Sequence, residues 1–120
     1  MTHYDFLYIL NRLKIFHWTT TSYSSHKAFD KIHKALDKHI DEFVEMFQGE
    51  YGTMPCGGED KPEAYTNDST GLTRFFNDCQ DFLLITIPQH INSDTDKDLL
   101  NKRDEILGCF STLKYLLTLN

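Results

Sequence analysis

The chain has no excess of basic residues and no hydrophobic run long enough to cross a membrane. Its 12 Lys and Arg residues stand against 18 Asp and Glu residues, which gives a formal net charge of -6 at pH 7. An acidic protein repels phosphate groups, so nucleic acids and anionic lipids are disfavoured as partners. A membrane-spanning helix needs roughly 20 consecutive apolar residues, and the sequence contains no such run. We therefore expect no nucleic acid partner and no membrane partner.

Cysteine pairs and a secretion signal are also lacking. The chain has 3 cysteines, an odd number, and none forms a C-x-x-C spacing, which disfavours a disulfide framework and a zinc ribbon. The opening residues MTHYDFLYIL lack the basic segment followed by an apolar one that marks a signal peptide. A cytoplasmic protein is expected, with the virion as an alternative location. Cys79 and Cys109 lie on apolar stripes and are predicted to be buried, whereas Cys56 beside two glycines is predicted to be exposed.

Apolar residues at helical spacing fill most of the sequence. At 120 residues and 40% hydrophobic, the chain predicts a single domain over 1–120 with a real core. No segment alternates with a period of two, so we expect an all-α fold, an antiparallel four-helix bundle with a long loop, 49–68, between the second and third helices. The expected helices run from a Thr2 cap to about His17, from Ser25 or His26 to about Gln48 with Gly49 as the stop, from Ser69 to about Ile87, and from a Ser93–Asp96 capping box to the C-terminus.

The second expected helix carries a band of ionisable residues between its apolar and basic faces. Plotted at about 100° per residue, its apolar stripe is Phe29, Ile32, Leu36, Ile40, Phe43 and Phe47, and four lysines (Lys27, Lys31, Lys34, Lys38) lie on the far side. The band between them is His26, Asp30, His33, Asp37, Asp41 and Glu45. Such bands are usually solvated helix faces, and a histidine beside a core is usually hydrogen-bonded structure.

The spacing within this band points to a metal site shared by two chains. His26 and Asp30 lie one turn apart, as do Asp41 and Glu45. The two pairs are separated by about 22 Å at 1.5 Å per residue, too far for one coordination sphere. An antiparallel second copy of the helix would bring one pair opposite the other, with the two-fold axis between Ala35 and Asp37. Nitrogen and oxygen ligands of this kind suit iron, manganese or zinc.

Three short motifs resemble the Dps mini-ferritins: F-H-W at 16–18, S-x-H-K-A-F-D at 24–30 and D-E-F-V-E at 41–45. The resemblance implies a ferritin-like bundle with a ferroxidase centre between two subunits. It also implies that one subunit supplies His17, His26 and Asp30 as metal ligands, that its partner supplies Asp41 and Glu45, and that Trp18 lies beside the metal. N-x-x-D-E-I-L at 101–107 and L-x-Y-L-x-T-L at 113–119 are similar to short ferritin-like proteins of large DNA viruses.

The expected function is therefore oxidation of Fe(II) by oxygen or peroxide in a homodimer, with His33 and Asp37 near the axis as supporting residues or an access route. No Lys-rich tail flanks the bundle in this sequence, so DNA coating is not expected. The alternative is a non-catalytic interaction protein or a virion-associated structural protein, in which 49–68 is the recognition element. A further alternative is a zinc or manganese site that is structural only. A centre within one subunit is not expected, because no histidine lies one turn from the carboxylates of the last two helices, Asp78, Asp81, Asp104 and Glu105.

Overall fold

The computed structural model describes residues 1–58 and 65–119, and these contain helices and no strand. The helices are α1 (His3–Thr19), α2 (Tyr23–Tyr51), α3 (Ser69–Asp81) and α4 (Lys97–Leu116). A π-helical turn (Phe82–Thr86) and a 3-10 turn (Ile87–His90) prolong α3. The prediction of an all-α protein with four principal helices is confirmed. None of these helices is both long enough and apolar enough to cross a membrane.

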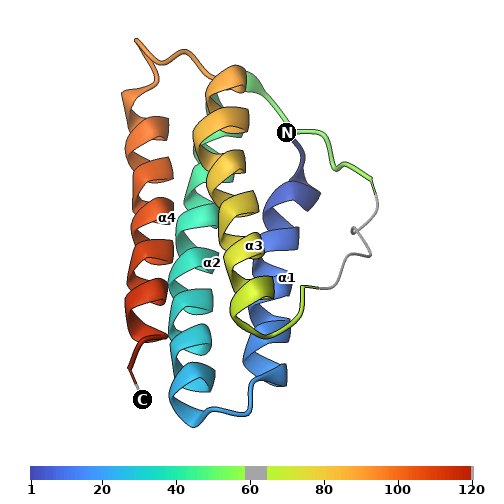
Figure 1. Ribbon diagram of the computed structural model, residues 1–120. Helices are drawn as coiled ribbons and strands as arrows, with labels where there is room; N and C mark the ends of the chain where they lie inside the picture. Colours follow the sequence, from blue (N-terminus) through green and yellow to red (C-terminus); the bar gives the residue numbers. More distant parts are fainter. Residues whose placement is uncertain (59–64, 120) are drawn as a thin grey trace.

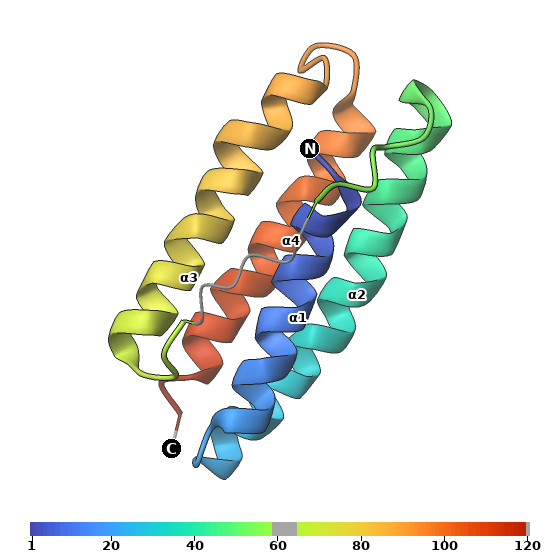
Figure 2. The ribbon, with the colours of Figure 1, turned by 90° about the vertical axis from the view of Figure 1, so that its right-hand side faces the viewer.

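Helix α2 is the longest element, and it sets the length of the molecule. Its 29 residues correspond to about 44 Å of helix, close to the longest extent of 42 Å. It packs chiefly on α1 and α4. Figures 1 and 2 together place α3 diagonally across from α2, with α1 and α4 on either side. In Figure 1, α1 and α4 run downward, while α2 and α3 both run upward.

One hydrophobic cluster joins all four helices, and the predicted stripe of α2 is its central contribution. Phe16 of α1 stacks on Phe29 of α2 at a ring separation of 5.6 Å, and Phe6 contacts Phe43 at 5.5 Å. Five members of the predicted stripe are buried, and the sixth, Phe47, packs partly buried against the cluster. Cys79 is buried and Cys56 is exposed, as predicted, whereas Cys109 is only half-buried.

The ends of α2 differ from the sequence prediction. The connection from α1 is shorter than expected, because α2 already begins at Tyr23, where the Ser22 hydroxyl accepts a hydrogen bond from the backbone N–H of Ser25 at 3.3 Å. At the other end the helix passes through Gly49 and stops at Gly52, whose φ of +87° is a backbone conformation that favours glycine. The prediction of Gly49 as the stop was therefore wrong. The Thr2 cap of α1 is confirmed, with Asp5 completing a capping box.

Two predictions at the start of α4 and the end of α3 also need correction. Pro88 does not end the helical path at Ile87, because it occupies the first turn of the 3-10 helix, where a proline loses no internal hydrogen bond. The expected Ser93–Asp96 capping box is absent. Asp96 is the N-cap residue of α4, but its side chain makes no capping bond. Its carboxylate accepts hydrogen bonds from the Tyr51 hydroxyl and the Asn92 backbone instead.

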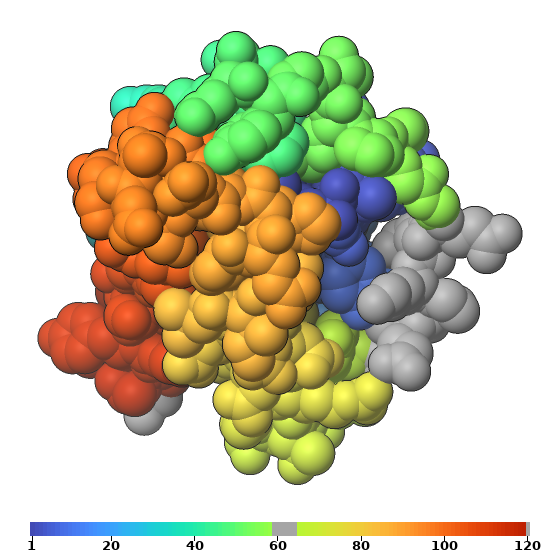
Figure 3. Space-filling view, turned by 90° about the horizontal axis from the view of Figure 1, so that it is seen from above, coloured from blue at the N-terminus to red at the C-terminus, as the bar shows by residue number. Residues whose placement is uncertain are grey.

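The expected loop 49–68 begins later than predicted and is anchored to α1. Met54 is buried, and its backbone N–H donates to Gln48 Oε1 at 3.1 Å. The carbonyls of Pro55 and Cys56 accept hydrogen bonds from the first N–H groups of α1 at 2.9 and 3.2 Å. Figure 3 shows this green segment against the blue start of α1. Residues 59–64 of the loop lie outside the described residues.

Candidate metal centre

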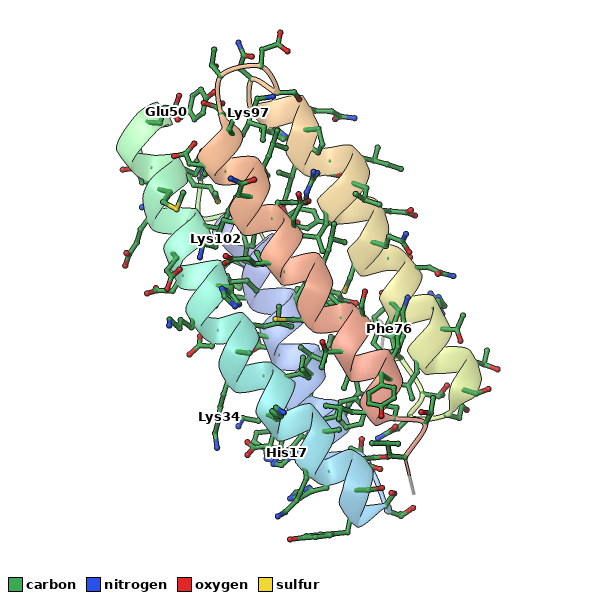
Figure 4. The ribbon with its side chains drawn as sticks, turned by 90° about the vertical axis from the view of Figure 1, so that its left-hand side faces the viewer. His17, Lys34, Glu50, Phe76, Lys97 and Lys102 are labelled. Atoms are coloured by element: carbon green, nitrogen blue, oxygen red, sulfur yellow. The ribbon has the colours of Figure 1, made fainter. Side chains whose placement is uncertain are left out.

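Two histidines face each other where α1 ends and α2 begins. The rings of His17 and His26 stack with centroids 3.8 Å apart and planes inclined by 19°. His17 Nδ1 lies 2.7 Å from the carbonyl oxygen of His26, and His26 Nδ1 lies 2.8 Å from the carbonyl oxygen of His17. Figure 4 labels His17 at this end of the bundle, behind α2. The pair therefore joins the two helices through reciprocal side-chain-to-backbone bonds.

The backbone explains why His26 donates to His17. The last carbonyls of a helix have no partner within it. The carbonyl of Phe16 is satisfied by the N–H of Thr20 at 3.0 Å, and the carbonyl of His17 is satisfied by the imidazole of His26. The short connection through Ser22 is what brings the two rings together.

These bonds assign the tautomer of both rings. A carbonyl oxygen can only accept, so each Nδ1 carries a hydrogen, and Nε2 is the ring atom left to offer a lone pair to a metal. Histidine ligands of metals typically donate their other ring N–H to a carbonyl or carboxylate in this way. The Nε2 atoms of His17 and His26 make no hydrogen bond to the described part of the chain. Both are therefore available as nitrogen donors.

Asp30, the third predicted ligand of this subunit, is turned toward a lysine. Its carboxylate accepts from Lys34 Nζ at 2.9 Å, and this bond lowers the pKa of the carboxyl, so that Asp30 is ionised at neutral pH. The ligand atoms of His17, His26 and Asp30 do not all come within 4.8 Å of one another. One chain thus supplies two aligned nitrogens and a nearby carboxylate rather than an assembled site.

The second predicted pair lies far along the same face. Asp41 and Glu45 are exposed, whereas His26 and Asp30 are half-buried. Because α2 is one continuous helix from Tyr23 to Tyr51, the two pairs remain about 22 Å apart and do not meet within the chain. The two pairs are therefore separated within the chain, as their spacing along one helix predicts.

Two further residues of the band lie between the pairs. His33 is half-buried and Asp37 is exposed. Burial, followed by the charge of Lys14, lowers the pKa of His33, so this imidazole is neutral at physiological pH. Trp18, beside His17 in sequence, is 70% exposed. An exposed tryptophan is uncommon, because burial of its large ring is favourable.

Helix α2 also carries two carboxylate clusters on its α4 side that the sequence interpretation missed. His39, Glu42 and Glu105 bring ligand atoms within 4.8 Å, as do Glu50, Asp96 and Asp98. Residues on separate helices form each cluster, so spacing along one helix could not reveal them. One pattern in the sequence could have indicated the second cluster: Asp94, Asp96 and Asp98 follow one another at every second position around the start of α4.

Residues 17–117 match the model of a family of unknown function (DUF5856), and the chain belongs to that family. The match includes both histidines of the stacked pair and ends after α4. No curated protein and no solved structure gives a significant match.

Proposed function

We propose that the protein is a ferritin-like four-helix bundle that dimerises through antiparallel α2 helices and oxidises Fe(II) with oxygen or peroxide at a site shared by two subunits. The observation that carries the proposal is the His17–His26 pair, whose rings are stacked and whose Nδ1 atoms are both bonded to carbonyls. The helix directions favour this fold. Ferritin-like bundles contain one long crossover, and α3 starts at the opposite end of the molecule from the end of α2 (Figure 1).

Two copies would complete the site by symmetry. In the proposed dimer the axis crosses between Ala35 and Asp37, so that His26 faces Glu45 of the partner subunit and Asp30 faces Asp41 of the partner subunit. This arrangement requires the band on α2 to be accessible. Its members are half-buried near His26 and exposed from Asp37 to Glu45. An isologous contact of this kind makes two identical sites.

The ligand chemistry suits ferrous iron as the substrate, with manganese or zinc as alternative ions. Nε2 atoms of His17 and His26 would donate nitrogen lone pairs, and Asp30 would turn from Lys34 to the metal. Carboxylates from the partner would add negative charge, which favours the more highly charged ferric ion. Each Fe(II) gives one electron, and the reduction of oxygen or peroxide to water takes up one proton for each electron. Hydrolysis of the Fe(III) product by water then releases protons to the solvent. Trp18, being exposed, would take oxidising equivalents that escape the site.

The experiment is Fe(II) addition in air, followed by the absorbance of the ferric product. Wild-type protein is expected to oxidise Fe(II) faster than buffer. His26→Ala and Glu45→Ala are each expected to lower the catalysed rate by at least ~10-fold, since even supporting residues of metal sites change activity by that order. His90→Ala and Asp81→Asn are matched controls, because both residues are exposed and lie on other helices.

Variants His26→Ala and Glu45→Ala that oxidise Fe(II) like the wild type would contradict the proposal. Two further measurements distinguish a structural metal site from a non-catalytic interaction protein. One is metal analysis of protein purified without added metal, and the other is thermal unfolding with and without chelator. Zinc or manganese that raises the melting temperature without iron oxidation would show a structural site. No co-purified metal and no effect of chelator would favour a non-catalytic interaction protein.

A further inference from the structure

A second group of carboxylates lies at the other end of the molecule, where α2 ends and α4 begins. Glu50 is in the last turn of α2, Asp96 is the N-cap residue of α4 and Asp98 lies in the first turn of α4. One carboxylate oxygen from each lies within 4.8 Å of the other two. Figure 3 looks onto this end, with the green end of α2 against the orange start of α4, and Figure 4 labels Glu50 and Lys97 there.

Asp96 is buried, and one of its two carboxylate oxygens has no hydrogen-bond partner among the described residues. The residue is only 1% exposed. Oδ2 accepts from the Asn92 backbone N–H at 2.7 Å and from the Tyr51 hydroxyl, whereas Oδ1 is buried without a hydrogen-bond partner among the described residues. Leaving an ionised oxygen buried and unpaired is unfavourable. The N–H groups of α4, the usual partners of an N-cap aspartate, do not serve it.

Among the described residues, no basic side chain balances the negative charge of this cluster. Neither Glu50, Asp96 nor Asp98 forms an ion pair within residues 1–58 and 65–119. Lys97, between two of the aspartates, donates to the carbonyl of Ser93 at 3.0 Å instead. Glu50 also stands at the C-terminal end of α2, where the helix dipole is negative. A side-chain hydrogen bond with Asp96 raises the pKa of the Glu50 carboxyl, so bringing these two carboxylates together is unfavourable without a proton or a cation.

The other carboxylate cluster between α2 and α4, formed by His39, Glu42 and Glu105, is neutralised by a lysine of the same chain. There Lys102 donates to both Glu42 and Glu105, and His39 lies 3.1 Å from Glu105. Figure 4 labels Lys102 on the seam between these two helices, further from the Glu50 end than Lys97. The cluster at Glu50 brings three carboxylates together, and no lysine of the described residues forms an ion pair with them. A cation from solution would fill the same role.

We propose that Glu50, Asp96 and Asp98 bind a hard divalent cation, with Ca²⁺ as the preferred ion, which fastens the end of α2 to the start of α4. All three ligands are carboxylates, and oxygen-only sites suit Ca²⁺, Mg²⁺ or Mn²⁺. The segment from Asn92 has Lys97 at its sixth position and Arg103 at its twelfth, so it is not an EF-hand loop, which needs glycine and glutamate there. The site would be independent of the proposed iron centre.

The test is calorimetric titration of the full chain with CaCl₂, and separately with MgCl₂ and MnCl₂, together with thermal unfolding in each salt. Wild-type protein is expected to bind one Ca²⁺ per chain and to melt at a higher temperature with Ca²⁺ than with chelator. Glu50→Gln and Asp98→Asn are each expected to weaken binding by about tenfold, since affinity follows the number of charged ligands. Asp94→Asn is the matched control on the same loop, and His26→Ala should bind Ca²⁺ like the wild type.

Two results would overturn the proposal. The first is absence of binding by Ca²⁺, Mg²⁺ and Mn²⁺ up to roughly 10 mM, above the weakest range of protein calcium sites. The second is a Glu50→Gln variant that melts higher than the wild type with no dependence on cations, which would show that a proton shared by Glu50 and Asp96 satisfies the cluster. Asp96→Asn is not used, because it would also change the partner of the Tyr51 hydroxyl.

Discussion

The two flanks of α2 carry similar ionisable residues, but the charges are paired within the chain on one flank and left largely unpaired on the other. On the middle of the α4 flank, Lys102 lies against Glu42 and Glu105, so the charges are balanced inside the chain. On the α1 flank, His26 keeps a free Nε2, and Asp41 and Glu45 are exposed without an ion pair in the described part of the structure. The first flank uses its charges to hold two helices together. The second leaves His26 Nε2, Asp41 and Glu45 without a partner in the described part of the structure, and it is there that we propose a partner subunit and a metal.

A cysteine at the proposed axis gives the largest expected effect. Asp37 would lie near its own copy in the antiparallel dimer, within the reach of about 4.4–6.8 Å between Cα atoms that a disulfide requires. Asp37→Cys is expected to become a covalent dimer under mild oxidation, seen on a non-reducing gel.

Lys31→Cys is the control for that experiment, since Lys31 lies on the basic far side of α2 and would not meet its own copy. Equal crosslinking of both variants, or crosslinking of neither, would contradict the proposal that the Asp37 side of α2 forms the dimer interface and the Lys31 side faces solvent. Cys56 is exposed, so both variants are best made in a Cys56→Ser background.

Removing Lys102 should lower the stability of the other flank with a defined pH dependence. Its bonds lower the pKa values of Glu42 and Glu105 below the ordinary 4.5 and raise the pKa of Lys102 above the ordinary 10.5. The stabilisation is therefore full between pH 4.5 and 10.5, is lost as the pH falls through the lowered carboxyl values, and is lost as the pH rises through the raised lysine value.

Urea unfolding of wild type and Lys102→Met at several pH values measures this contribution. We expect a lower midpoint for the variant at neutral pH and convergence of the two proteins as the pH falls through the lowered carboxyl pKa values, with Lys31→Met unchanged throughout. A difference that persists in strong acid would mean that packing of the lysine stem, rather than its charge, supplies the stabilisation.

The smallest expected effect concerns Lys34, whose Nζ lies 2.9 Å from the carboxylate of Asp30. Exposed ion pairs one helical turn apart contribute little. Lys34→Met is therefore expected to tighten binding of Zn²⁺, a redox-inert probe, by about twofold. Lys27→Met serves as the control. Weaker binding in Lys34→Met would mean that Lys34 supports the site instead of competing for its carboxylate.

The sequence predicted the buried faces well and the helix ends poorly. The stripe from Phe29 to Phe43 repeats with helical spacing and is buried as predicted, because removing its apolar side chains from water is favourable. The stop of α2 depended on contacts distant in sequence. Gln48 Oε1 bonds to His3 Nε2 at 2.7 Å and also accepts from the backbone of Met54, so the helix continues past Gly49 to Gly52.

The candidate sites show the same division. Spacing along one helix identified His26 and Asp30, and the resemblance added His17, which the structure brings into contact with His26. The cluster of Glu50 with Asp96 could not be predicted, because it depends on how α2 and α4 are aligned. The predicted capping box of α4 is absent for the same reason, since the carboxylate of Asp96 accepts a hydrogen bond from the hydroxyl of Tyr51 at the end of α2.

Mixing two inactive variants tests most directly whether the iron site is shared between subunits. His26→Ala and Glu45→Ala chains, unfolded together and refolded, would pair at random, and each mixed dimer would contain one site with every ligand intact. The account predicts recovery of about one quarter of the wild-type Fe(II) oxidation from parents that have almost none. A mixture as inactive as its parents, with both variants folded and dimeric, would contradict it.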